Sequence, residues 1–333
     1  MDKFSSRQIP QFVTIGFDDN DKSGFMPEKG VEGMKWAVDT FVNRKNPDGT
    51  NCSCAFYFTS AYITNGEAEE PTHFVKKSWR YALDKGCEIG CHTHSHPHGE
   101  NFSVDEWLAE MEKCVDILSR PYVEGSDDND TGIGIPKSEI KSFRTPYLES
   151  NDNTLIAVKK MGFIYDCSLE EGFQEDQDGT NFRFPYKLES GVWEVPAHVV
   201  IVPPDDLCEK YGTKKGLRKK CAELQSSFNE NDGKITGLDY NCFVEYQMTA
   251  DEFLSTLKYT LDLRLKGNRA PFTLGGHTGI YAQEYDCEPA IKISEKERRR
   301  VIEEFLDYAQ SKEEVRIVSP IKIIQWIKNQ KKL

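Results

Sequence analysis

Apolar and polar positions follow two alternating periods along the chain, and these periods predict strands followed by helices. Short apolar runs bounded by polar turn residues predict strands at Gln11 to Phe17 and at Ser53 to Thr59. Apolar residues at helical spacing predict helices at Val31 to Val42 and at His73 to Lys85. The chain therefore opens with a strand–helix–strand–helix order, which is typical of a parallel sheet.

The same alternation continues to the C-terminal end. Serine followed by glutamate three residues later forms a capping box at Ser103 and again at Ser294, so a helix is expected to begin at each. The remaining strands are predicted at 87–91, 140–144, 163–166, 192–195, 271–274 and 315–318, and the remaining helices at 103–118, 153–161, 249–265, 294–308 and 320–328.

About eight strands alternate with helices, without an internal repeat or a linker. At 333 residues the chain could form one α/β barrel or two ordinary domains. Evenly spaced strands with polar residues at their exits favour a single distorted (β/α) barrel over 1–333, and no GxGxxG follows the first strand. The charged, lysine-rich segment from Pro203 to Tyr240 breaks the rhythm. We expect it to be an insertion that is attached to the rest of the domain through disulfides of its bracketing cysteines, Cys208, Cys221 and Cys242.

A histidine-rich loop follows the strand predicted at 87–91. Residues 86–99 hold four of the seven histidines, and neutral imidazole is a common ligand of zinc-like metals. Two histidines and one carboxylate are the ligand count of an open, catalytic metal site, which His92, His96 and Asp19 could supply. Such an ion would lower the pKa of a bound water and polarise a carbonyl. The alternative is a polar loop with a biased composition.

Other candidate residues also follow predicted strands. Asp18 would be left over as a base, Arg144 and Tyr147 end the strand near Ile140, and His277 follows two glycines. In a barrel these strand ends meet at one face, where such enzymes carry their sites. The alternatives are a turn or helix cap for the aspartates, a surface ion pair for Arg144, and a structural histidine for His277.

Composition narrows the class of protein further. A net charge of −13 speaks against nucleic-acid binding, and no apolar run approaches the roughly 20 residues of a membrane helix. Residues 1–6 lack the apolar core of a secretory signal, so the protein is either intracellular or a mature chain whose signal was removed. Ten scattered cysteines favour disulfides and a secreted protein, and three glycosylation sequons are compatible with it.

Four motifs in order resemble the polysaccharide deacetylase family, and in particular its animal-type chitin deacetylases. They are the Asp18-Asp19 pair, His92 to His96, Arg144-Thr145-Pro146-Tyr147, and Leu274 shortly before His277. The animal-type branch is also echoed in Arg44 to Gly49, Trp193 to Pro196 and Ile324 to Ile327, so the resemblance runs along nearly the whole chain.

The resemblance implies a role for each of these residues. Asp18 would be the general base, oriented by Arg144, and His277 the general acid. Asp19, His92 and His96 would hold one divalent metal, which the resemblance implies to be zinc, and the Tyr147 N–H would help to hold the oxyanion. Leu274 would line the pocket for the acetyl methyl, and Trp193 is a candidate for the substrate site. His94 and His98 have no family role.

The implied activity is metal-dependent hydrolysis of the N-acetyl groups of chitin or chitooligosaccharides, by a monomer without a membrane span or nucleic-acid partner. Two alternatives stay open. The enzyme could act on acetylxylan or peptidoglycan with nearly the same site chemistry. The chain could also be a carbohydrate-binding protein that turns nothing over, although an intact Asp18 and His277 argue against that.

Overall fold

The strand β1, Gln11–Asp18, lies at the centre of the molecule, and all eight of its residues are buried. The computed structural model describes residues 9–64 and 68–330, so the expectation for residues 1–6 lies outside the described part. β1 pairs in parallel with β11, Phe272–His277, on one edge. On its other edge it pairs in parallel with β12, Val315–Ile317, near its start and with β2, Ala55–Phe58, near its end. Burial on both faces explains why its sequence is almost continuously apolar.

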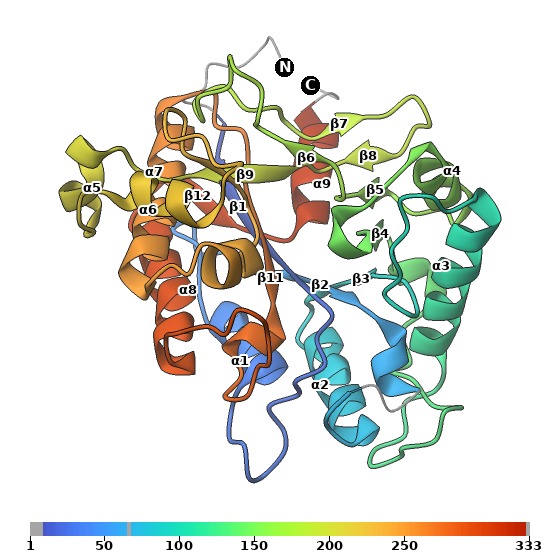
Figure 1. The fold of residues 1–333 in the computed structure, drawn as a ribbon. Helices are drawn as coiled ribbons and strands as arrows, with labels where there is room; N and C mark the ends of the chain where they lie inside the picture. The colour runs from blue at the N-terminus through green and yellow to red at the C-terminus, as the bar shows by residue number, and fades with distance from the viewer. Residues whose placement is uncertain (1–8, 65–67, 331–333) are drawn as a thin grey trace.

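The main sheet continues from β2 in the order β3-β4-β5-β8-β7, and only the β7–β8 pair is antiparallel. A second sheet of three strands, in the order β10-β9-β6, lies beside β11 (Figure 1). The Gly275 N–H of β11 donates a hydrogen bond to the Gly237 carbonyl, 2.8 Å away, just after β10. These strands are β3, Glu88–Cys91; β4, Ser142–Phe143; β5, Tyr165–Asp166; β6, Glu170–Glu171; β7, Tyr186–Lys187; β8, Trp193–Glu194; β9, Ala197–Ile201; and β10, Lys234–Thr236.

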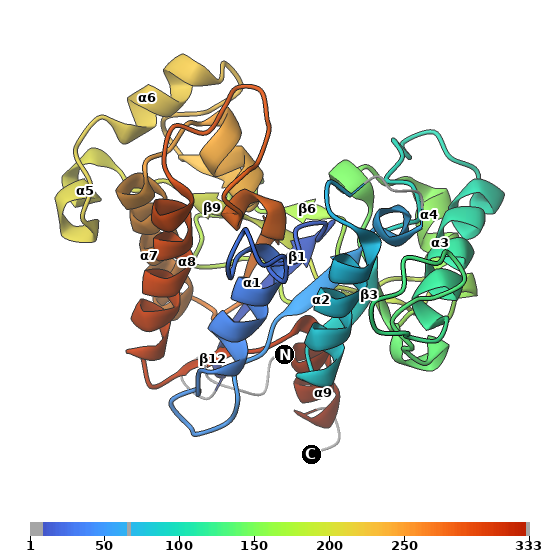
Figure 2. The same ribbon diagram turned by 90° about the horizontal axis from the view of Figure 1, so that it is seen from below.

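Helices surround the main sheet, with α5 and α6 farther out beyond α7 (Figures 1 and 2). The arrangement confirms the predicted α/β class and the distorted (β/α) barrel, in which the second sheet takes part of the wall. No described helix combines the length and the apolar character that crossing a lipid bilayer requires. The helices are α1, Gly33–Val42; α2, Thr72–Asp84; α3, Val104–Ser119; α4, Asp152–Lys160; α5, Asp205–Tyr211; α6, Leu217–Leu224; α7, Ala250–Lys266; α8, Glu295–Gln310; and α9, Pro320–Gln330.

The region 203–240 is where the structure departs most from the predicted elements. It holds α5, α6 and β10, and its last residues return to pair with the second sheet. The expected disulfide attachment is absent from the structure. All ten cysteines lie in the described part of the chain, and all are free. Cys208, Cys221 and Cys242 are instead buried in the main hydrophobic core, where a thiol packs as a small apolar group. The predicted disulfides are therefore not shown among the described residues, and the extracellular location stays a prediction.

Both predicted capping boxes are present, at the start of α3 and of α8. Ser103 accepts a hydrogen bond from the backbone N–H of Glu106, whose side chain accepts one from the Ser103 N–H in return. Replacing Ser103 by alanine should lower the free energy of unfolding by about 1 kcal/mol, as measured by urea denaturation. Ser227→Ala, at an exposed serine outside any helix, is the matched control and should change stability by less than half as much. Equal effects of the two substitutions would contradict this account of the cap.

Candidate active site

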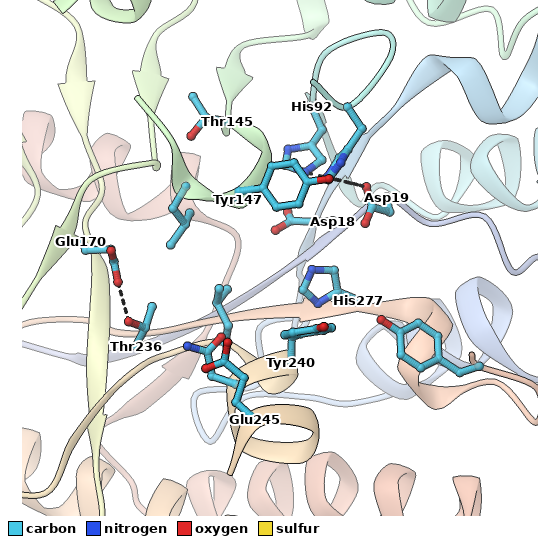
Figure 3. A pocket seen from close by; sticks show the side chains of 15 residues that line it. Asp18, Asp19, His92, Thr145, Tyr147, Glu170, Thr236, Tyr240, Glu245 and His277 are labelled. Carbon is cyan, nitrogen blue, oxygen red and sulfur yellow. Dashed lines mark hydrogen bonds and ion pairs between the residues drawn. The ribbon is translucent and has the colours of Figure 1, made fainter. Parts of the chain in front are cut away.

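The predicted site residues meet because parallel strands end at the same edge of the sheet. Asp18 is the last residue of β1 and lies in register with His277, the last residue of β11. His92 directly follows β3, and Arg144 follows the neighbouring β4. The Arg144 N–H donates to the Cys91 carbonyl, which keeps the two chains side by side as they leave the sheet. Asp18 and His277, which are 259 positions apart in the sequence, therefore line one cavity (Figure 3).

Asp19, His92 and His96 form the one cluster in the described part of the chain whose donor atoms could hold a metal ion. Their ligand atoms all lie within 4.8 Å of one another. Nε2 of His96 is 3.3 Å and Nε2 of His92 is 3.9 Å from Oδ1 of Asp19. Ligands at the roughly 2.0–2.2 Å typical of zinc stand at about these separations from each other. The donor set and its spacing therefore fit a divalent ion with room for further ligands.

Hydrogen bonding prepares His92 to bind a metal through Nε2. Its Nδ1 lies 2.8 Å from the Arg144 carbonyl oxygen, which can only accept, so Nδ1 carries the proton and Nε2 has a free lone pair. Burial lowers the pKa of His96 to about 4 despite the nearby Asp19 carboxylate, so its imidazole is neutral at pH 7, as a ligand must be. Burial opposes ionisation of Asp19, but the charges of His96 and His92 hold its pKa below the usual value.

A buried ion pair holds Asp18 beside this cluster. Nη1 of Arg144 donates to Oδ1 and Oδ2 of Asp18 at 2.9 and 3.2 Å. The guanidinium also lies 4.4 Å from the centre of the Tyr57 ring. Burial disfavours the charged guanidinium, but the Asp18 carboxylate raises the pKa of Arg144 above its usual value. A Cβ atom on Gly16 would lie 2.7 Å from the Tyr57 ring and 3.2 Å from the guanidinium, so glycine there leaves the space that this pair occupies.

His277 has a partner that the sequence analysis missed. Asp239, fully buried just after β10, lies with Oδ1 2.8 Å from Nδ1 of His277 and accepts a hydrogen bond from the His277 N–H. Burial favours the neutral imidazole, but the Asp239 charge and hydrogen bond raise the pKa of His277 to about 9. His277 is therefore protonated at neutral pH. The sequence signal for Asp239 was faint, because it closes the segment that we read as an insertion.

Tyr147 covers the edge of the cavity next to His96. Its ring is 55% exposed and lies between His96, in edge contact at 4.6 Å, and His98, stacked at 4.1 Å with 7° between the planes. Oε1 of Glu149 lies 3.0 Å from Nδ1 of His98 and helps to hold that stack. His98, for which the family resemblance implied no role, therefore supports the Tyr147 ring. Left-handed backbone angles, which are costly for most residues, cluster in these loops at Asp19, Asn20, Thr93, His96, Tyr147 and Leu148.

The cavity has a volume of about 460 Å³, within the range of sites that bind small molecules. Two predicted substrate contacts do not line it. Leu274 is buried in the main core, and Trp193 is buried in a second core with Phe12 and Ile324. Leu238 lines the cavity instead and passes so close to Gly275 that a Cβ there would lie 2.2 Å from its Cδ2. Beyond the strand-end residues, the lining consists of Thr145, Leu148, Glu170, Thr236, Leu238, Tyr240, Asn241, Glu245 and Tyr285.

Comparison with known proteins bears on this geometry. Residues 48–165 match the model of the polysaccharide deacetylase family, which confirms the predicted resemblance. The matched range includes His92, His96, Arg144 and Tyr147. It does not include Asp18, Asp19 or His277, which the fold brings to the same cavity.

Alignments with similar proteins cover almost the whole chain. Chitin deacetylase 1 of Bombyx mori is 25% identical over 97% of this chain, and chitin deacetylase 8 of the same species is 23% identical over 97%. The chain spans about half (52%) of the first relative and 72% of the second. A solved polysaccharide deacetylase structure from Mycobacterium smegmatis has a TM-score of 0.56 at 17% identity and covers 97% of this chain and 92% of its own, which supports the fold.

The three-residue cluster should bind one zinc ion per chain. We expect His96→Ala to weaken zinc binding at least about tenfold, because it removes a donor that the protein holds in place. Competition with a chromophoric chelator measures the affinity, and thermal unfolding with and without zinc gives a second readout. His73→Ala, which removes a histidine paired with Asp127 outside the cavity, is the control. Zinc affinity that is equal in the two variants would exclude His96 as a ligand.

The Asp239–His277 pair should be visible in a pH titration of the metal-free protein. NMR of the His277 ring should show an inflection near pH 9, and Asp239→Asn should shift it down by more than about one unit because the carboxylate is lost. The stability that the pair contributes is fully present below about pH 6.5, the ordinary histidine value, and is lost as the pH rises to about 9. An unchanged inflection in Asp239→Asn would contradict the assignment.

Proposed function

We propose that the protein is a metal-dependent hydrolase that removes N-acetyl groups from chitin or chitooligosaccharides and releases acetate. One observation carries the proposal: a candidate metal triad shares a single cavity with a carboxylate and a protonated histidine. The names of the two silkworm relatives support chitin as the substrate. In the proposal, the whole of 1–333 forms one catalytic domain that acts as a secreted monomer.

The assignment of roles rests on charge and position. Asp19, His92 and His96 would hold the ion, which we propose to be zinc, and which would polarise the acetamide carbonyl and acidify a water molecule. Asp18, held in place by its ion pair with Arg144, accepts the proton of the attacking water. The Tyr147 N–H donates to the oxyanion of the tetrahedral intermediate. His277 gives its proton to the nitrogen as the carbon–nitrogen bond breaks, so that one water is consumed and acetate and an amine leave.

The raised pKa of His277 favours amide over ester hydrolysis. An amine is a poor leaving group unless it is protonated, whereas the sugar hydroxyl that leaves an acetyl ester needs less help. A histidine with a pKa of about 9 remains charged throughout the neutral range and can supply that proton. This supports N-acetyl sugars over acetylxylan as the substrate.

The test is acetate release from chitooligosaccharides, acetylxylan and peptidoglycan, with zinc and with a chelator. We expect release from chitooligosaccharides that the chelator abolishes and zinc restores. Asp18→Asn and His277→Ala should each lower kcat by roughly 10²-fold or more, because each removes a proton-transfer group. Asp130→Asn and His73→Ala, at positions outside the cavity, are the matched controls and should retain activity. If metal-loaded protein releases no acetate from any substrate, the chain is a binding protein rather than a deacetylase.

A further inference from the structure

Two carboxylates that line the cavity take no part in the proposed reaction. Glu170 lies on β6 of the second sheet, and Glu245 ends the single π-helical turn Asn241–Glu245. The described residues that line the cavity include no lysine or arginine, and neither glutamate forms an ion pair with any part of the chain that the structure describes. His277, the protonated histidine of this cavity, pairs with Asp239, so the two glutamates have no ion-pair partner among the described residues.

Polar groups beside Glu170 extend the same side of the cavity. The Thr236 hydroxyl donates to the Glu170 carboxylate across the second sheet. Thr145 is fully buried, yet its Oγ1 has no hydrogen-bond partner among the described residues. Buried hydroxyls are nearly always paired, so a free one that lines a cavity indicates a group supplied by a ligand. Figure 3 shows Thr145, Glu170, Thr236 and Glu245 on one side of the view and Asp19, His92 and His277 on the other.

We infer that Thr145, Glu170, Thr236 and Glu245 form a subsite for a sugar that carries a free, protonated amino group. This sugar would be linked to the one whose acetamide is hydrolysed, so the inference rests on the proposed function and specifies its substrate class. An ammonium group offers three donors, which match carboxylate and hydroxyl acceptors. The same charges repel sugars that carry a carboxylate. Each turnover leaves an amine, so partly deacetylated chains become better substrates than fully acetylated ones.

The first experiment compares two chitotetraose substrates, one fully acetylated and one with a single free amine next to an acetylated sugar. For the wild-type enzyme, kcat/KM should be about two- to fivefold higher for the amine-bearing tetramer, the range expected of partly exposed charge pairs. High salt should reduce the ratio toward one, because it screens these charges. The Glu170→Gln/Glu245→Gln double variant should also bring the ratio to about one.

A matched control removes the same number of charges elsewhere. Glu189→Gln/Glu209→Gln changes two exposed glutamates outside the cavity and should keep the wild-type ratio. A wild-type ratio at or below one, or a raised ratio that survives in Glu170→Gln/Glu245→Gln, would overturn the subsite.

The second experiment does not depend on turnover. Calorimetry with the fully deacetylated tetramer, which has no acetamide to hydrolyse, should show salt-sensitive binding that Glu170→Gln/Glu245→Gln weakens by a similar factor. Such binding without acetate release from any substrate would refute the proposed function but support the subsite for the protonated amino sugar. Acetate release without any preference for the amine would refute the subsite and leave the deacetylase standing.

Discussion

The buried ion pair between Asp18 and Arg144 joins the central strand of the sheet to a strand three positions away. Asp18 is 4% exposed and Arg144 6% exposed, so the pair stands in a medium where an isolated charge would be very costly. Loss of either residue would leave the charge of the other buried and unpaired, so the geometry of the pair is fixed. Because the Arg144 carbonyl also accepts from His92, the same residue sets the orientation of the carboxylate and of a candidate metal ligand.

The loops at this edge of the sheet hold unfavourable backbone conformations. Six of the eight non-glycine residues with positive φ among those described follow β1, β3 or β4. Asparagine and aspartate adopt this region more readily than the other residues, so the packing beneath must compensate for the remaining four. Such strain is typical of sites in which side chains are held ready for a ligand. It also explains why residues that look unremarkable in the sequence, such as Thr93 and Leu148, occupy these turns.

Periodicity predicted the main sheet well, because its strands are apolar on both faces and its helices have apolar stripes. The convergence of Asp18, His92, Arg144 and His277 followed from the rule that parallel strands end together. Asp239 escaped notice because its partner lies 38 residues away and the short strand before it has no clear pattern. The same difficulty hid β6, β7, β9 and β10, which are short or belong to the second sheet.

Two further expectations differ from what the structure shows, and both differences depend on side-chain direction and environment. The sequence places Leu274 near His277, but it does not tell which face of β11 meets the cavity, and Leu238 takes that place. Cysteine spacing likewise predicted disulfides, whereas burial made nine of the ten thiols part of the packed interior. Both outcomes depend on contacts between distant segments, which periodicity does not encode.

After α6 the chain returns to the second sheet and there forms the far wall of the cavity. Most of the ionisable groups of the cavity come from other segments. The ionisable groups at the strand ends lie on or just after strands of the main sheet, while Thr236, Leu238 and Tyr240 belong to the segment 203–240. Exchange of residues 203–240 would therefore reshape the far wall of the cleft and leave all but Asp239 of the chemistry intact. The far wall of the cavity and most of its ionisable groups are therefore carried by different segments of the chain.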